Sequence, residues 1–173
     1  MNASQIHLAL NHVPLFFSII GGLVLIYGFI RKNESIKILS LYFMIMAALF
    51  IIPVYLTGEG TEEMVEKLPG VSERMIEEHE EMAKIGLVII IITGVAALSA
   101  LVLKKKTTLL KPVLILCAIF SFASFGVFAQ TAHLGGQIRH TEIKNNSVTS
   151  AESENANNES DQKKKEVKTQ DDD

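Results

Sequence analysis

The sequence lacks most of the features that stabilise a soluble domain or carry a common catalytic chemistry. Its single cysteine, Cys117, cannot form a disulfide within the chain. No lysine or arginine precedes Arg31, so the basic start of a cleavable signal peptide is missing and we expect the first apolar segment to be retained. The chain also has no His-Glu-x-x-His, no Glu-x-x-His, no glycine-rich phosphate loop and no Cys-x-x-Cys-His. These absences exclude the zinc-peptidase, ferritin-like, P-loop and c-type haem classes.

Charged residues are also missing from four long stretches, residues 13–30, 38–58, 85–103 and 112–137. Each has about 20 residues or more, which is enough for a helix to cross a hydrocarbon layer of roughly 30 Å. The strands of a membrane barrel are shorter and alternate polar with apolar residues. The pattern therefore predicts an all-α integral membrane four-helix bundle embedded in a lipid bilayer.

The breaks in the pattern predict the helix bounds. Within a transmembrane domain of residues 1–143, we expect helices at about 4–29, 34–56, 72–103 and 108–132. Pro14 predicts a kink near Leu10, because proline cannot donate a hydrogen bond and crowds the preceding turn. We expect residues 57–60 to break the second helix and the glycine pair at 135–136 to end the fourth. The polar residues 144–173 should form a disordered tail.

Small residues indicate where these helices approach one another, because membrane helices associate through close backbone contacts. We expect this role for Gly21, Gly22, Gly28, Gly86, Gly94, Ala97, Ala123 and Gly126.

Charge in the connecting segments predicts the orientation. The first and third connections are basic, with Arg31 and Lys32 in one and residues 104–106 all lysine in the other, whereas the segment 59–84 is rich in glutamate. Short basic loops remain in the cytoplasm. We therefore expect a multi-pass protein of the bacterial cytoplasmic (inner) membrane, N-out and C-out, with residues 59–84 on the periplasmic side.

All five histidines fall on the predicted outer side: His7, His12, His79, His133 and His140. Three different predicted helices contribute them at similar depth, and neutral imidazole is the commonest metal ligand and also a haem ligand. We expect His12 and His79 to be the main ligands, with His7 and His133 as a second pair or as supporting groups. The glutamates around His79 should keep an unligated imidazole partly protonated.

With the motif-based sites excluded, a non-covalent b-type haem is the ligand that fits these histidines best, and a divalent metal ion (copper, zinc or iron) is the alternative. A haem-binding slot needs apolar walls and polar or basic groups that bind the propionates. We expect walls from Phe16, Phe17, Phe125 and Phe128, with Arg139 or Lys144 at the propionates. Groups that support the ligands are expected among Glu59, Asn11, Gln130, Arg139 and His140, since a carboxylate partner fixes the tautomer of a ligating histidine.

The element His7-x4-His12-x-Pro14, the later His79 and the element His133-x-Gly135-Gly136 resemble a bacterial domain-of-unknown-function family. Its members are small four-helix membrane proteins with histidines suggested to bind haem. The likeness spans about residues 4–143, and the sequence departs from the family after the glycine pair, at Gln137 to His140. The resemblance implies the same fold and a histidine-built haem site.

Three functions follow as hypotheses. The first is electron transfer through haem b with a quinol or a periplasmic cytochrome. The second is binding or transport of a bare metal ion, and the third is a non-catalytic assembly or anchor subunit. Whether the protein is an enzyme, and its oligomeric state, stay open at this point. No feature of the sequence indicates a nucleic-acid partner.

Overall fold

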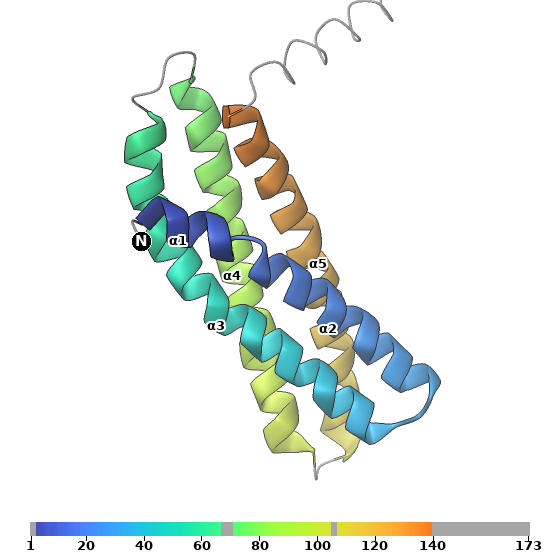
Figure 1. Ribbon diagram of the computed structural model, residues 1–173. Coiled ribbons are helices and arrows are strands. Elements are labelled where there is room, and N and C mark those ends of the chain that lie inside the picture. The colour runs from blue at the N-terminus through green and yellow to red at the C-terminus, as the bar shows by residue number, and fades with distance from the viewer. Residues whose placement is uncertain (1–2, 67–70, 105–106, 140–173) are drawn as a thin grey trace, which may run out of the picture.

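The computed structural model of the protein describes residues 3–66, 71–104 and 107–139, which form five helices. These are α1 (Ala3–Leu10), α2 (Val13–Ile30), α3 (Glu34–Val65), α4 (Glu73–Leu103) and α5 (Thr107–Arg139). The four long helices run alongside one another in alternating directions, and each packs against two neighbours (Figure 1). The short α1 crosses α3 near the end where α4 begins. The expected disorder of residues 144–173 falls outside the described residues.

Four segments of this bundle are long and apolar enough to cross a membrane: Ser4–Ile30, Glu34–Gly58, Glu73–Leu103 and Leu109–Ile138. Large hydrophobic side chains are exposed along their outer faces, as lipid contact requires. The described residues contain no strand. The prediction of a helical chain with four apolar spans is therefore confirmed.

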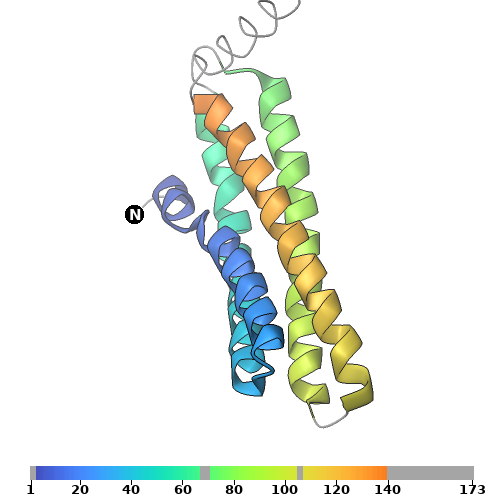
Figure 2. The same ribbon diagram turned by 90° about the vertical axis from the view of Figure 1, so that its right-hand side faces the viewer.

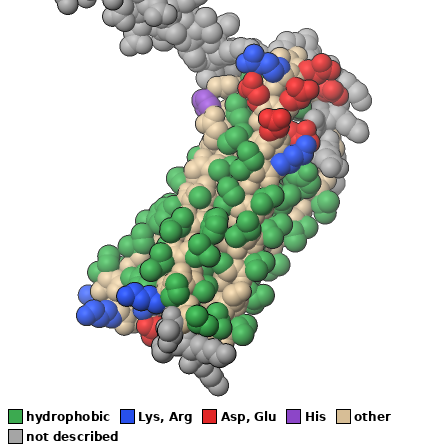
Figure 3. Space-filling model, turned by 180° about the vertical axis from the view of Figure 1, so that it is seen from behind, with side chains coloured by type: hydrophobic (Ala, Val, Ile, Leu, Met, Phe, Trp, Pro, Cys, Tyr) green, Lys and Arg blue, Asp and Glu red, His purple; other side chains and the backbone are tan. Residues whose placement is uncertain are grey.

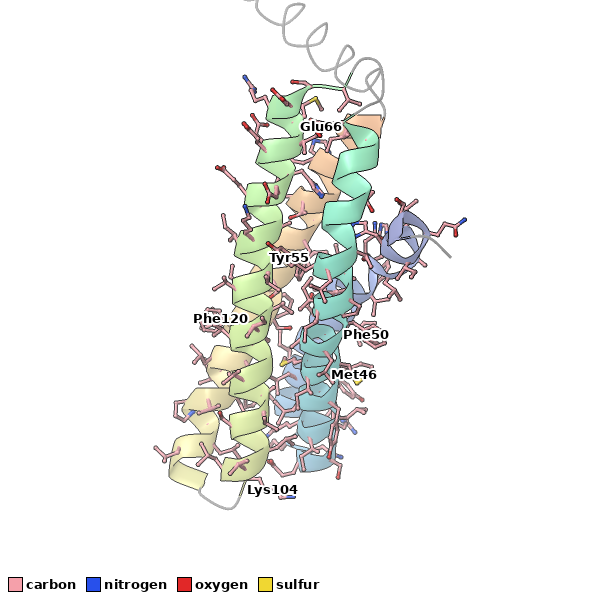
Figure 4. All side chains as sticks on the ribbon, turned by 90° about the vertical axis from the view of Figure 1, so that its left-hand side faces the viewer. Met46, Phe50, Tyr55, Glu66, Lys104 and Phe120 are labelled. Atoms are coloured by element: carbon pink, nitrogen blue, oxygen red, sulfur yellow. The ribbon has the colours of Figure 1, made fainter. Side chains whose placement is uncertain are left out.

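The two ends of the bundle differ in charge. Figure 3 shows mainly acidic side chains with a few basic ones at one end, mainly basic ones at the other and a hydrophobic belt between them. Lys104 and Glu66 mark the opposite ends in Figure 4. We call the end where α4 begins the acidic end; its carboxylates include Glu66, Glu73, Glu77, Glu78, Glu80 and Glu81. We call the other the basic end; its cations include Arg31, Lys32, Lys37 and Lys104.

The expected kink at Pro14 is confirmed as a complete break between two helices. α1 ends at Leu10 and α2 begins at Val13, with His12 at its N-cap. Pro14 has no N–H to offer the carbonyl of Leu10, so the helical ladder is interrupted there. Figure 2 shows α1 turned away from the axis of α2. The break directs α1 towards α3, against which it packs.

Two predicted helix ends are wrong. The segment 57–60 does not break the second helix, because α3 continues to Val65. There the hydroxyl of Thr57 donates to the carbonyl oxygen of Pro53 at 2.6 Å, and that of Thr61 to the carbonyl oxygen of Thr57 at 3.0 Å. Likewise α5 runs through the glycine pair to Arg139, and Ile138 is buried. The hydrogen bonds within α3 and the burial of Ile138 in α5 offset the low helix propensity of glycine.

Several of the expected close approaches occur, and two do not. A Cβ added at Gly86 would meet the ring of Phe128 at 2.6 Å, and one at Gly94 would overlap Ala48. These contacts join α4 to α5 and to α3. Gly126, by contrast, is exposed and has open space beside it, so its expected packing role within the chain is wrong. Ala123 is exposed as well.

Candidate functional site: two equivalent histidine seats

His7 on α1 is fixed to α3 by a hydrogen bond from its ring. Its Nδ1 lies 2.9 Å from the carbonyl oxygen of Val54. Gly58, four residues after Val54, faces the same ring, and a Cβ there would stand 3.4 Å from Cε1. In a helix the residue at i+4 lies over the carbonyl of residue i. The missing side chain at Gly58 therefore leaves the oxygen of Val54 accessible to an outside donor.

His79 on α4 is fixed to α5 in the same way. Its Nδ1 lies 2.9 Å from the carbonyl oxygen of Thr131. Gly135 follows Thr131 by four residues, and a Cβ there would stand 3.1 Å from Cε1 of the ring. Each histidine thus occupies a seat made of one helix carbonyl and the glycine four residues later. The repeat of this arrangement on two helix pairs makes the residues a candidate site rather than isolated interfacial histidines.

The seats also fix the tautomer of both rings. A carbonyl oxygen only accepts, so Nδ1 must carry the proton in each neutral imidazole. Nε2 then carries the lone pair, and among the described residues it has no hydrogen-bond partner on either ring. A ligating histidine is commonly held in this way, with its other nitrogen donating to a backbone carbonyl. On both rings Nε2 is therefore the nitrogen that could accept a ligand.

The two rings lie within electrostatic reach of each other. His79 precedes the charge-free segment 85–103 by about two turns, and its pKa lies below the ordinary value. Burial is the main cause; the nearby charge of a protonated His7 adds to the lowering, and the carbonyl of Thr131 opposes it. The neighbouring glutamates that we expected to keep His79 partly protonated are not among the causes of this shift, which burial dominates.

Apolar residues lie on both sides of the histidine layer. Towards the middle of the bundle, Val54 and Phe128 belong to a buried cluster with Ala47, Ile51 and Ile90, onto which Leu10 and Leu87 pack. Towards the acidic end, a second cluster contains Met75, Ile76 and Ile138. These residues flank His79 along α4 and Thr131 along α5. The half-buried imidazoles thus lie between two apolar layers.

The structure does not join His12 to His79. The ring of His12 is exposed at the start of α2, contacts Asn11 through Nδ1 and stacks on Phe16 at a centroid distance of 6.4 Å. Asn11 therefore supports His12 and not His7. Among the sequence candidates, the geometry favours His7 as the partner of His79.

His133 and Gln130 also lie apart from the pair. Both side chains are exposed on α5. His133 bonds Gln137 one turn later, with 2.8 Å between its Nε2 and the amide nitrogen. Because that amide nitrogen only donates, Nε2 of His133 accepts and is already occupied.

The expected aromatic slot is formed only in part. Phe128 is buried beside Gly86, whereas Phe16 is exposed. Phe17 packs instead on Phe43 and Phe50 of α3, with centroid distances of 5.8 and 6.0 Å. The side chains of Glu59 and Arg139, as well as His140 and Lys144, lie outside the description.

The residues that the sequence reasoning missed are Val54, Thr131 and Gly58. Two of them act through backbone oxygens, which no side-chain pattern reveals. Gly58 was interpreted as part of a helix break, although a glycine inside an apolar helical pattern often has a packing reason. Within the described residues, no group of three or more His, Cys, Asp or Glu could hold a metal ion, so the candidate site rests on a pair.

Comparison of the chain with protein-family models, with curated proteins and with solved structures gives no significant match.

Proposed function

We propose that this protein is a multi-pass membrane protein that binds b-type haem between His7 and His79, and that it transfers electrons between a quinol and a periplasmic cytochrome. The observation that carries the proposal is the pair of equivalent histidine seats. Each leaves one Nε2 lone pair unused, and the two rings come from different helices, α1 and α4, within electrostatic reach of each other. Neutral imidazole is a common ligand of haem iron, so His7 and His79 would hold the group.

The donor chemistry of the site fits this group. The hydrogen bonds to Val54 and Thr131 orient the rings and raise the basicity of the free nitrogens. The apolar clusters on either side supply the water-poor surroundings that a porphyrin prefers. Haem, when bound, would supply one-electron chemistry, while the chain positions the two ligands and limits the access of water.

The charge asymmetry supports a periplasmic position for this site. The basic end carries Arg31, Lys32 and Lys104 in short connections, and such connections favour the cytoplasm of a bacterial inner membrane. The histidine seats lie towards the acidic end, the opposite one. A site there would be within reach of a periplasmic electron carrier and of a membrane quinol.

The test is an absorption spectrum of the full chain purified after expression with ample haem. We expect a Soret band that disappears in His7→Ala and in His79→Ala. The matched controls His12→Ala and His133→Ala should keep it, because both rings are exposed outside the seats. A colourless wild-type protein would remove the haem proposal. Loss of the band in His12→Ala with retention in His7→Ala would overturn the choice of ligands.

A second candidate, binding of a copper ion, is favoured by one observation. Met75 lies one turn before His79 on α4 and is buried in the cluster at the acidic end. Residues four apart share a helix face, so a soft thioether is placed on the side of the imidazole. Thioether ligands select Cu(I). Stoichiometric copper in a colourless wild-type sample, reduced by Met75→Leu, would support this function instead.

A further inference from the structure

A cavity lies at the basic end of the bundle, far from the histidine seats. Its volume is about 250 Å³. Three helices line it, and its residues are Glu34, Lys37, Ile38 and Leu41 of α3, Ala100, Leu101 and Lys104 at the end of α4, and Leu110 and Leu114 of α5. The described hydrogen bonds and ring contacts of the histidines involve none of these residues. The cavity therefore needs an explanation of its own.

The cationic groups of the cavity differ in their pairing. Lys37 donates to Glu34 with an Nζ to Oε1 distance of 2.7 Å, and its side chain is only 14% exposed. Its ammonium also lies 5.0 Å from the ring centroid of Phe29. Lys104 is exposed and has no ion pair among the described residues. One positive charge of the cavity is therefore neutralised by Glu34, and the other is available.

The inner wall of the cavity is apolar. Leu101 and Leu110 are half-buried on this wall, and Leu41, Ala100 and Leu114 are almost fully buried. The three buried residues belong to the core cluster that also contains Met44 and Cys117. The cavity thus combines an apolar interior with a free ammonium at the end of the bundle. A small polar anion would leave the apolar wall unused, and a neutral apolar molecule would leave Lys104 unpaired.

We propose that this cavity binds an anionic phospholipid of the leaflet at the basic end. The phosphate lies at Lys104, with the Lys37–Glu34 pair beside it, and the first part of one acyl chain enters the apolar interior. Basic pockets between membrane helices on the cytoplasmic side hold anionic headgroups through this combination of charge and depth. The volume is smaller than a typical pocket for a whole drug-sized ligand, so most of the lipid stays in the bilayer. This site does not depend on the proposed haem function.

The test is native mass spectrometry of the full chain, released from bilayers of phosphatidylglycerol mixed equally with phosphatidylcholine. We expect the wild type to retain phosphatidylglycerol preferentially. Lys104→Gln should lower that retention roughly fivefold, the effect of one surface cation near an anionic lipid. Lys111→Gln is the matched control, because Lys111 is exposed at the same end but does not line the cavity.

A second variant tests the depth of the site. Leu101→Trp would enlarge a half-buried side chain on the cavity wall without changing its charge, and it should lower retention of phosphatidylglycerol while Lys104 is intact. Equal retention of both lipids by the wild type would overturn the proposal. So would equal losses in Lys104→Gln and Lys111→Gln, which would indicate general surface charge and not a built site.

Discussion

The imidazole of His79 packs directly against Gly135, so that a Cβ at this glycine would stand 3.3 Å from the ring nitrogen Nδ1. That nitrogen donates to the oxygen of Thr131, one turn earlier on α5. The glycine and the carbonyl act as one unit, since the first makes the second accessible. His7 repeats the relationship on α3 with Gly58 and Val54.

Gly135→Ala should disturb this unit, and Gly136→Ala should not. An added methyl at position 135 forces the ring of His79 to shift by a few tenths of an ångström, whereas position 136 has open space. Alanine favours a helix over glycine by about 0.5–1 kcal/mol, so Gly136→Ala should be stabilising and Gly135→Ala should lose that gain. Thermal unfolding and the ¹⁵N signals of the His79 ring measure both effects without any ligand. Equal thermal stability and equal ring signals in the two variants would contradict the packing of His79 against Gly135.

Gly58→Ala provides an intermediate case. Its added Cβ would meet the His7 ring at 3.4 Å, which is an ordinary contact distance. We therefore expect a smaller shift of the ring signals than in Gly135→Ala.

Pro14→Ala should displace α1 from α3. Alanine restores an N–H that can reach the carbonyl of Leu10, so α1 and α2 can join into one straight helix. Spin labels at the exposed positions Ala9 and Leu56 should then move apart, and ligand retention should fall because His7 leaves Val54. Pro112→Ala, at an exposed position near the start of α5, is the control. An unchanged label distance in Pro14→Ala would show that packing against α3, and not the proline, sets the direction of α1.

The proposed orientation can be tested by labelling. In a background with the buried Cys117 replaced by alanine, a cysteine at Glu66 should react with an impermeant reagent added from the periplasmic side. A cysteine at Asn33 should react only after the membrane is opened. Both positions are exposed and lie at opposite ends of the bundle, so access depends on sidedness and not on burial. The reverse pattern would place the histidine seats on the cytoplasmic side.

The helical spans could be predicted because they depend on a coarse property, the absence of charge over lengths that match a bilayer. The break at Pro14 could also be predicted, because it follows from a missing N–H. The ends of α3 and α5 could not. Glycine and threonine weaken a helix locally, but Gly58 and Gly135 contact the rings of His7 and His79 on other helices.

The candidate site was only partly predictable for a related reason. The position of each histidine in the sequence predicts its depth in the membrane. It does not predict the side of the helix on which the ring lies. His12 lies nearer to the apolar part of its helix than His7, which favours His12 on sequence alone, yet the turn at residues 11–12 leaves its ring exposed. The acceptors that select His7 and His79 are backbone oxygens, and their accessibility depends on how the helices pair.

The two seats belong to different halves of the chain, one joining α1 to α3 and the other joining α4 to α5. Any group bound by both imidazoles would connect these two halves of the chain. Movement of one half against the other would then change the coordination directly, in addition to the packing that already joins α3 to α4 and α2 to α5. A partner of the folded state stabilises it in proportion to the logarithm of its concentration above Kd. The amount of mature protein in the membrane should accordingly follow the supply of the group it binds.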